Sequence, residues 1–112
     1  MAYSFGGSPA ALDTPPQKKG GVTYVPWRDV VEALQGSVSW DNATKTATGR
    51  VHHFTCRFTL GSGTGDVNGT TVTFSAPSYV DDGTLFVPAD FFNSAYGYKV
   101  TVSGNDVDIS LP

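Results

Sequence analysis

The chain has 112 residues, which is room for one domain with one hydrophobic core. A hydrophobic fraction of 39%, an aromatic fraction of 12% and a formal net charge of -3 are typical of a folded protein and argue against intrinsic disorder. Ten acidic against seven basic residues argue against nucleic acid or an anionic membrane as the main partner. No segment approaches the roughly 20 apolar residues of a membrane-spanning helix.

The segment 1–20 is expected to be an irregular N-terminal segment. Glycine and proline interrupt it at 6–9 and 14–16, although Tyr3–Phe5 fits one edge strand. Residues 1–6 carry neither the basic nor the apolar region of a secretory signal. A cytosolic protein, a mature protein that has lost its leader and a piece of a longer chain remain open as alternatives.

The remainder of the chain, 21–112, aligns with itself when position 21 is placed over position 83 (offset 62). The segment 21–26 (GVTYVP) then lies over 83–88 (GTLFVP) without a gap. Further identities at this offset are Ala33 with Ala95 and Val38 with Val100. Both copies show a β-rich run that ends at a proline, then a short helix and a strand with a partner strand. This order indicates an internal repeat.

The two expected helices begin at Pro26 and Pro88, because proline fits the first helical turn. They are expected to end at Gly36 and Gly97, since glycine is the preferred residue after a helix. In the first helix an apolar stripe recurs at helical spacing and consists of Trp27, Val30, Val31 and Leu34. Strands are expected to follow at 37–40 and 98–102, with partner strands at 45–51 and 106–111.

A β-rich segment, 52–82, joins the two halves. Apolar and polar residues alternate over 54–60, which is the period of a half-buried strand. The dipeptide Asn68-Gly69 is typical of a primed two-residue turn and predicts a hairpin over 66–75. The sequence therefore predicts one α+β domain over 21–112, in which two ββαβ-like internal repeats (about 21–51 and 83–111) place two short helices on antiparallel or mixed sheet.

Four stretches of the sequence together resemble a known family. They are YVPWR at 24–28, VSWDNATKT at 38–46, DVNGTTV at 66–72 and DGTLFVP at 82–88. The pattern resembles the copper amine oxidase-like N-terminal domain, also called a stalk domain, over about residues 15–111. The second half departs from it, with Ala89-Asp90 in place of Leu-Arg and Val102-Ser103 in place of Trp-Asp.

The resemblance implies a non-catalytic accessory module of secreted or cell-surface bacterial proteins. The stalk of a copper amine oxidase holds neither the copper nor the quinone cofactor, so the resemblance implies no catalytic residue, no metal and no cofactor here. It implies an extracellular or cell-surface location, and a protein or a cell-envelope polymer as partner. No site residues of the family carry over to this sequence.

Three residues suggest a metal site, namely His52, His53 and Cys56. In a continuous strand His52 and His53 would point to opposite faces. His52 and Cys56 would share a face about 13 Å apart, which is too far for two ligands of one ion. Unless the strand is broken there, we predict no metal site, with Cys56 in the core and both histidines at an edge or surface.

The remaining motifs have structural explanations. The glycine-rich run 61–65 lacks the Lys-Ser/Thr ending of a phosphate loop and is expected to be a hairpin loop. No nucleophile motif accompanies Cys56 or any serine, so we predict that the chain is not an enzyme. Four carboxylates lack the calcium-loop pattern and fit turns and solvated strand faces; they are Asp81, Asp82, Asp106 and Asp108.

Most aromatic side chains are expected in the core. Tyr79 and Tyr98 fit the core periodicity least well, and with Trp40 they are the candidates for ligand contact, because exposed rings form a platform for sugars or side chains. The sequence favours a non-catalytic interaction module, with a carbohydrate or cell-wall glycan-binding domain as the alternative. An exposed edge strand would favour pairing with a partner or with a second copy of the chain.

Overall fold

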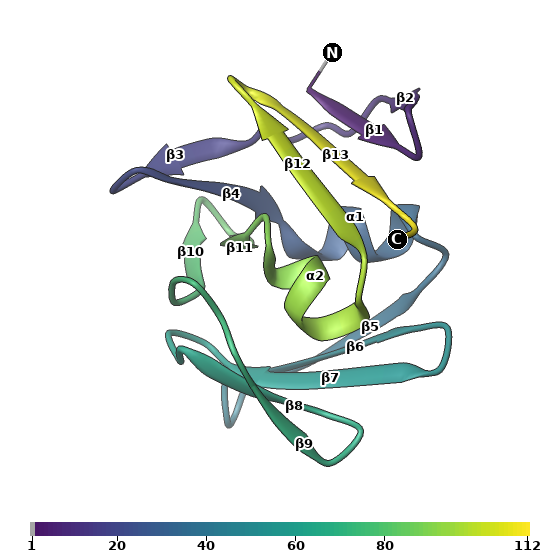
Figure 1. Ribbon diagram of the computed structural model, residues 1–112. Helices are drawn as coiled ribbons and strands as arrows, with labels where there is room; N and C mark the ends of the chain where they lie inside the picture. The colour runs from purple at the N-terminus through teal and green to yellow at the C-terminus, as the bar shows by residue number, and fades with distance from the viewer. Residues whose placement is uncertain (1) are drawn as a thin grey trace.

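Three small β-sheets surround two short helices in the computed structural model, which describes residues 2–112 (Figure 1). The helices are α1 (Trp27–Ala33) and α2 (Phe91–Tyr96). Figure 1 shows both helices in the middle of the molecule, between the sheet that contains β12 and β13 and the sheet of β5 to β9. The arrangement is an α+β fold, as the sequence predicts.

The central sheet is built from the strands that precede the helices. Its order is β10-β11-β4-β3, all antiparallel, with β3 (Gln17–Lys19), β4 (Val22–Pro26), β10 (Tyr79–Asp81) and β11 (Thr84–Pro88). The bounds of β3 and β4 recur in β10 and β11 at the offset that relates the two halves of the sequence. Across the middle of the sheet Val25 pairs with Val87, its own equivalent at that offset.

Each helix is followed by a hairpin that enters an outer sheet. One outer sheet has the order β12-β13-β1-β2, with β12 (Lys99–Ser103), β13 (Asp106–Ser110), β1 (Tyr3–Phe5) and β2 (Ser8–Ala10). The other is a five-stranded antiparallel meander of β5 (Ser37–Asp41), β6 (Thr46–Val51), β7 (Phe54–Thr59), β8 (Thr64–Val67) and β9 (Thr70–Thr73). Each half thus contains two strands, a helix and two more strands, one strand more than the expected ββαβ-like unit.

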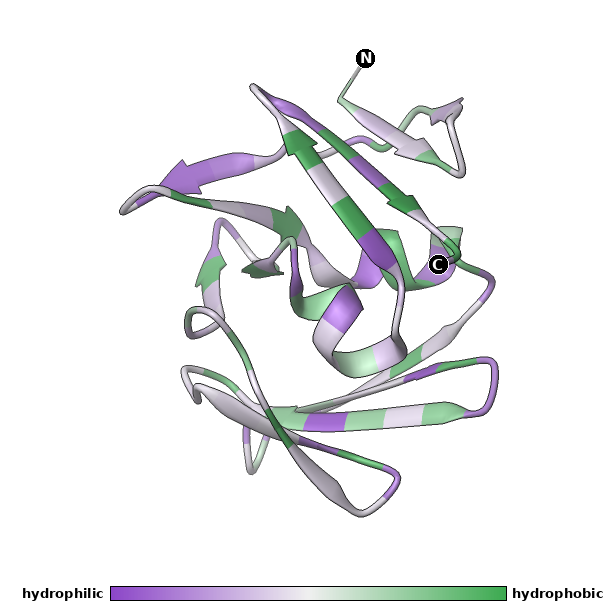
Figure 2. Cartoon of the chain, in the orientation of Figure 1, coloured by the Kyte–Doolittle hydropathy of each residue, from purple (hydrophilic) through white to green (hydrophobic). Residues whose placement is uncertain are grey.

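Hydrophobic side chains from all three sheets meet at the helices. Figure 2 shows the alternation of apolar and polar residues along β12 and β13, and Val107 and Ile109 of β13 are buried. The largest fully buried side chains include Tyr3, Phe86, Phe91, Phe92 and Ile109. They belong to one core cluster with Trp27, Val30 and Val31 of α1, apart from Phe86, which stacks on Tyr79 in the central sheet.

The N-terminal segment differs from the irregular structure expected for it. Within the described part of 1–20 lie the strands β1, β2 and β3. Gly6 and Gly7 have φ of 61° and 82° and form the tight turn between β1 and β2, so they connect strands instead of interrupting them. Strand β1 is not an edge strand, because it lies between β2 and β13 and is parallel to β13.

The predicted turns are mostly confirmed. Asn68 and Gly69 both have positive φ, 50° and 90°, as a primed hairpin turn requires. Gly97 takes the left-handed conformation after α2. After α1, however, Gln35 takes that conformation with φ of 66°, and Gly36 follows it. Gly36 is required for another reason, because a side chain there would collide with β6.

Candidate binding groove

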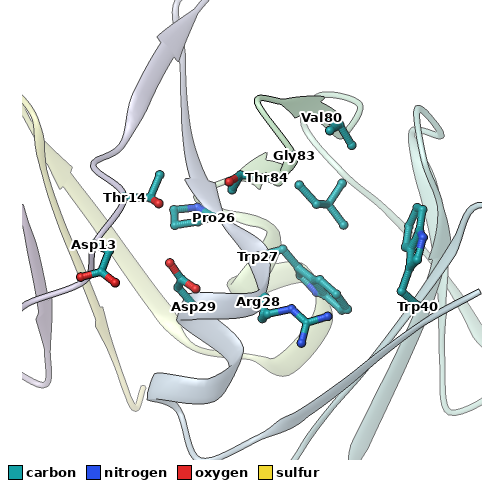
Figure 3. A pocket seen from close by; sticks show the side chains of 11 residues that line it. Asp13, Thr14, Pro26, Trp27, Arg28, Asp29, Trp40, Val80, Gly83 and Thr84 are labelled. Carbon is teal, nitrogen blue, oxygen red and sulfur yellow. The ribbon is translucent and has the colours of Figure 1, made fainter. Parts of the chain in front are cut away.

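A groove of about 380 Å³ lies where the central sheet, the start of α1 and the edge of the five-stranded sheet meet (Figure 3). Trp40 lies on one side of the groove and Val80 on the other, while Asp13 and Asp29 lie at the end away from Trp40. Arg28 lies between the end with Trp40 and the end with the two aspartates. We call this surface the Trp40 groove; its further lining residues are Thr14, Pro26, Trp27, Gly83, Thr84 and Leu85.

The apolar end of the groove is formed by two edge strands. Trp40 of β5 is 36% exposed and Val80 of β10 is 48% exposed. Trp40 stands in the same row of the sheet as Ala47 and Phe58, whose side chains belong to the core. Trp40 therefore lies on the inner face of its sheet, but at an edge where no further strand of residues 2–112 covers it. Trp27 also lines the groove, but its side chain is buried.

The other end of the groove carries an excess of negative charge. Asp13 and Asp29 line it, and both also line an adjoining hollow together with Glu32. Partial burial raises the pKa of Asp29 above its usual value, and the negative charges of Asp13 and Glu32 raise it further, while Arg28 opposes this. The side chain of Arg28 is exposed and makes no hydrogen bond among residues 2–112. Its guanidinium is thus available to an acceptor on a ligand.

The three candidate aromatic residues do not form one platform. Trp40 lines the groove. Tyr79 is half-buried, and its hydroxyl donates a 2.6 Å hydrogen bond to Gln17 while its ring stacks on Phe86 at 5.4 Å between centroids. Tyr98 is only 5% exposed and belongs to the core cluster. A solvent-facing ring in this groove is therefore supplied by Trp40.

The two histidines and Cys56 do not lie on one continuous strand. His52 and His53 form the turn between β6 and β7, with φ of 54° at His52, so the strand is broken there. Both histidines are exposed, as predicted, and Cys56 is 0% exposed in β7. Burial raises the pKa of the Cys56 thiol to about 12. Among residues 2–112 no group of three or more His, Cys, Asp or Glu side chains is placed to hold a metal ion.

Sequence patterns alone do not identify most of the groove. Asp13 lies in an irregular connection and Val80 in a three-residue strand, and their sequence neighbours do not indicate that they meet. Arg28 and Asp29 carry a partial signal, since charged residues in the first turn of a helix stand at the surface beside the preceding strand. Trp40 of β5 and Val80 of β10 belong to different sheets and line one groove only in the folded chain, which is a tertiary effect.

Comparison with known proteins gives a family match over most of the chain. None of the helices in residues 2–112 is long and apolar enough to cross a membrane. No curated protein matches the chain. The family model described as copper amine oxidase N-terminal domain matches residues 4–111, which include most of the N-terminal segment as well as both halves. The resemblance noted in the sequence is thereby confirmed, and the chain belongs to the copper amine oxidase N-terminal domain family.

Proposed function

We propose that this domain is a non-catalytic accessory module that makes binding contacts for secreted or cell-surface proteins. The observation that carries the proposal is the family match over 4–111, because this N-terminal domain is a non-catalytic domain in copper amine oxidases. The Trp40 groove supports it. Exposed apolar side chains beside charged groups are suited to holding another molecule in place.

A glycan-binding domain is the second candidate. The exposed indole of Trp40 lies in a groove with the polar side chains of Asp13, Arg28 and Asp29. Aromatic rings stack on the apolar faces of sugars, and carboxylate and guanidinium groups bind sugar hydroxyls. In this alternative Trp40 is the central contact residue.

A binding panel separates the two candidates. The purified chain is passed over cell-wall polysaccharides and over immobilised envelope proteins, with a copper titration beside it. Saturable retention on protein supports the accessory module, whereas polysaccharide retention that Trp40→Ala abolishes supports the glycan-binding domain. Tight stoichiometric copper binding, or retention on neither matrix, would contradict the proposal.

We further infer that the two halves arose as copies of one unit. The recurrence of strand bounds at a constant offset and the pairing of Val25 with Val87 support this. A chain in which 21–26 carries the sequence of 83–88 should then still unfold in one cooperative transition. Loss of that transition would mean that 21–26 and 83–88 do not occupy equivalent environments, which would argue against two copies of one unit.

A further inference from the structure

The Trp40 groove is bordered by a sheet edge that is open to pairing. Strand β5 pairs with β6 on one side, and no strand of residues 2–112 lies on its other side. An unpaired edge presents backbone N–H and C=O groups that can accept a further strand. The groove therefore offers main-chain hydrogen bonds as well as the side-chain contacts of Trp40.

Most other edges of this protein carry residues that discourage pairing. Proline stands in β2, lysines stand in β3 and β12, and β10 has only three residues. Lysine, proline and short length are the usual protections of exposed edges. Strand β9 lacks them too, but it presents threonines and no exposed large apolar residue. Strand β5 combines an unprotected five-residue edge with the exposed Trp40.

The charges of the groove favour a partner segment with positive charge. Asp13, Asp29 and the adjacent Glu32 set three carboxylates against the one guanidinium of Arg28. A basic side chain is attracted to this end, and the free donors of Arg28 suit the carbonyl groups of a peptide backbone. A glycan fits less well, because Trp40 is the one exposed ring among the groove residues. A neutral sugar can donate hydrogen bonds to the carboxylates, but their excess negative charge does not attract it as it attracts a basic side chain.

We propose that the Trp40 groove binds an extended basic segment of a partner protein, which adds a strand to the free edge of β5. An apolar side chain of this segment packs between Trp40 and Val80, and a Lys or Arg side chain lies beside Asp13 and Asp29. Alternate residues of a strand point to the same side, so the apolar and basic residues of the segment are separated by an even number of positions. This inference rests on the accessory function proposed above and specifies its partner.

The first test selects the segment without assuming its sequence. Random eight-residue peptides displayed on phage are selected on the whole chain, and enriched peptides are synthesised with a fluorescent label for binding by anisotropy. We expect enriched sequences to pair an apolar residue with a Lys or Arg two or four positions away. No enrichment over background, or enrichment of acidic peptides, would overturn the proposal.

Variants then locate the bound peptide. Trp40→Ala should weaken binding about tenfold or more, and Asp13→Asn and Asp29→Asn about threefold each, with the charge effects shrinking at high salt. The control for Trp40 is Val102→Ala, which removes apolar surface from a residue that is 42% exposed on the other outer sheet. The control for the charges is Asp90→Asn, which lies outside the groove and retains an oxygen for the hydrogen bond from Ser75. Both controls should bind like the original chain.

Circular dichroism and a second variant distinguish a loss of the binding contact in Trp40→Ala from a loss of folding. Val80→Lys places a positive charge on an exposed strand position and should weaken the same peptides at least as much without disturbing the core. Binding that Trp40→Ala and Val80→Lys leave unchanged would overturn the proposal.

Methylation of peptide nitrogens tests strand pairing itself. Alternate amides of a bound edge strand face β5, so N-methylation of one alternate set should abolish binding and methylation of the other set should not. Equal tolerance of both sets would overturn strand addition. Self-association of the chain through β5, measured by light scattering, would mean that a second copy of the chain occupies this edge. That result would overturn the proposal of a separate partner protein. Retention on polysaccharide with no peptide enrichment would overturn this inference while leaving a non-catalytic binding module in place.

Discussion

Gly36 connects α1 to β5 at a point where there is no space for a side chain. A Cβ atom there would overlap the carbonyl oxygen of Arg50 and lie 2.8 Å from methyl carbons of both Val31 and Val51. We expect Gly36→Ala to lower the free energy of unfolding by about 1–3 kcal/mol, because helix and sheet must move apart. Urea denaturation measures the change.

The matched control for Gly36 is Gly63, in the loop before β8. A Cβ atom at Gly63 would meet nothing within 4 Å, and this glycine does not need the left-handed conformation. Gly63→Ala should leave the unfolding midpoint within the range of an ordinary surface substitution, roughly 0.5 kcal/mol. Equal effects of the two substitutions would show that the contact of α1 with β6 is not tight.

Ser4 makes a pH-dependent contact between the first strand and β13. Its hydroxyl donates a 2.5 Å hydrogen bond to Asp108, and Gly7 N–H donates a second at 3.0 Å. These bonds hold the pKa of Asp108 below its usual value in the folded state. A carboxylate with a lowered folded pKa stabilises the protein above its unfolded pKa, and this contribution is lost as the pH falls through the folded pKa.

Ser4→Ala should therefore destabilise the protein most at neutral pH. We expect a loss of about 0.5–1 kcal/mol at pH 7, with the difference from the original chain shrinking below about pH 4. Thermal unfolding of both proteins between pH 7 and pH 3 tests this. A difference that stays constant over the whole range would mean that the hydroxyl acts independently of the carboxylate.

At the scale of elements, the chain leaves α1 through a residue that is poorly suited to its backbone conformation. Gln35 has φ of 66°, and Gly36 N–H closes the helix by donating to Val31. A left-handed conformation is costly for a residue with a Cβ and free for glycine, whose greater entropy in the unfolded chain offsets part of the gain. Gln35→Gly should raise the free energy of unfolding by about 0.5 kcal/mol, and Gln35→Ala should not; a loss on Gln35→Gly would contradict this account of the cap.

Strand β1 depends on one buried aromatic residue. The Tyr3 ring is among the largest fully buried side chains, and its hydroxyl donates a 2.7 Å hydrogen bond to the carbonyl of Thr14. We expect Tyr3→Ala to cost about 3–5 kcal/mol and Tyr3→Phe only about 1 kcal/mol in chemical denaturation. A small effect of Tyr3→Ala would mean that the N-terminal strands are dispensable, as an irregular segment would be.

Local chemistry predicts those elements whose signals are local. The proline before α1, the glycine after α2 and the Asn68-Gly69 turn place their elements close to the observed bounds. The second helix was expected to begin at Pro88, which was wrong, because Pro88 ends β11 and α2 begins at Phe91. Strand β1 could not be placed as an inner strand, because its partner β13 lies at the opposite end of the sequence and nothing near Tyr3 signals the pairing. The groove was missed for the same reason, since Asp13, Trp40 and Val80 come from three distant segments.

At the scale of the whole molecule, both halves and the N-terminal strand share one hydrophobic core. The cluster joins Tyr3 of β1, Val31 of α1, Cys56 of β7 and Phe92 of α2. A core that both halves and β1 share favours unfolding in a single cooperative step. The Cys56 thiol, which is fully buried, then becomes accessible only when the whole domain opens.

Thiol labelling of Cys56 measures how often the whole domain opens in the intact chain. At pH 8 a disulfide reagent should react with native Cys56 at least about a thousandfold more slowly than with the urea-unfolded chain, because marginally stable domains open rarely and the buried thiol has its pKa raised to about 12. If opening is global, Gly36→Ala should speed labelling in proportion to its loss of stability, whereas Gly63→Ala should not. Rapid labelling at the same rate in the original chain and in Gly36→Ala would mean instead that β7 and its neighbours open separately from the core.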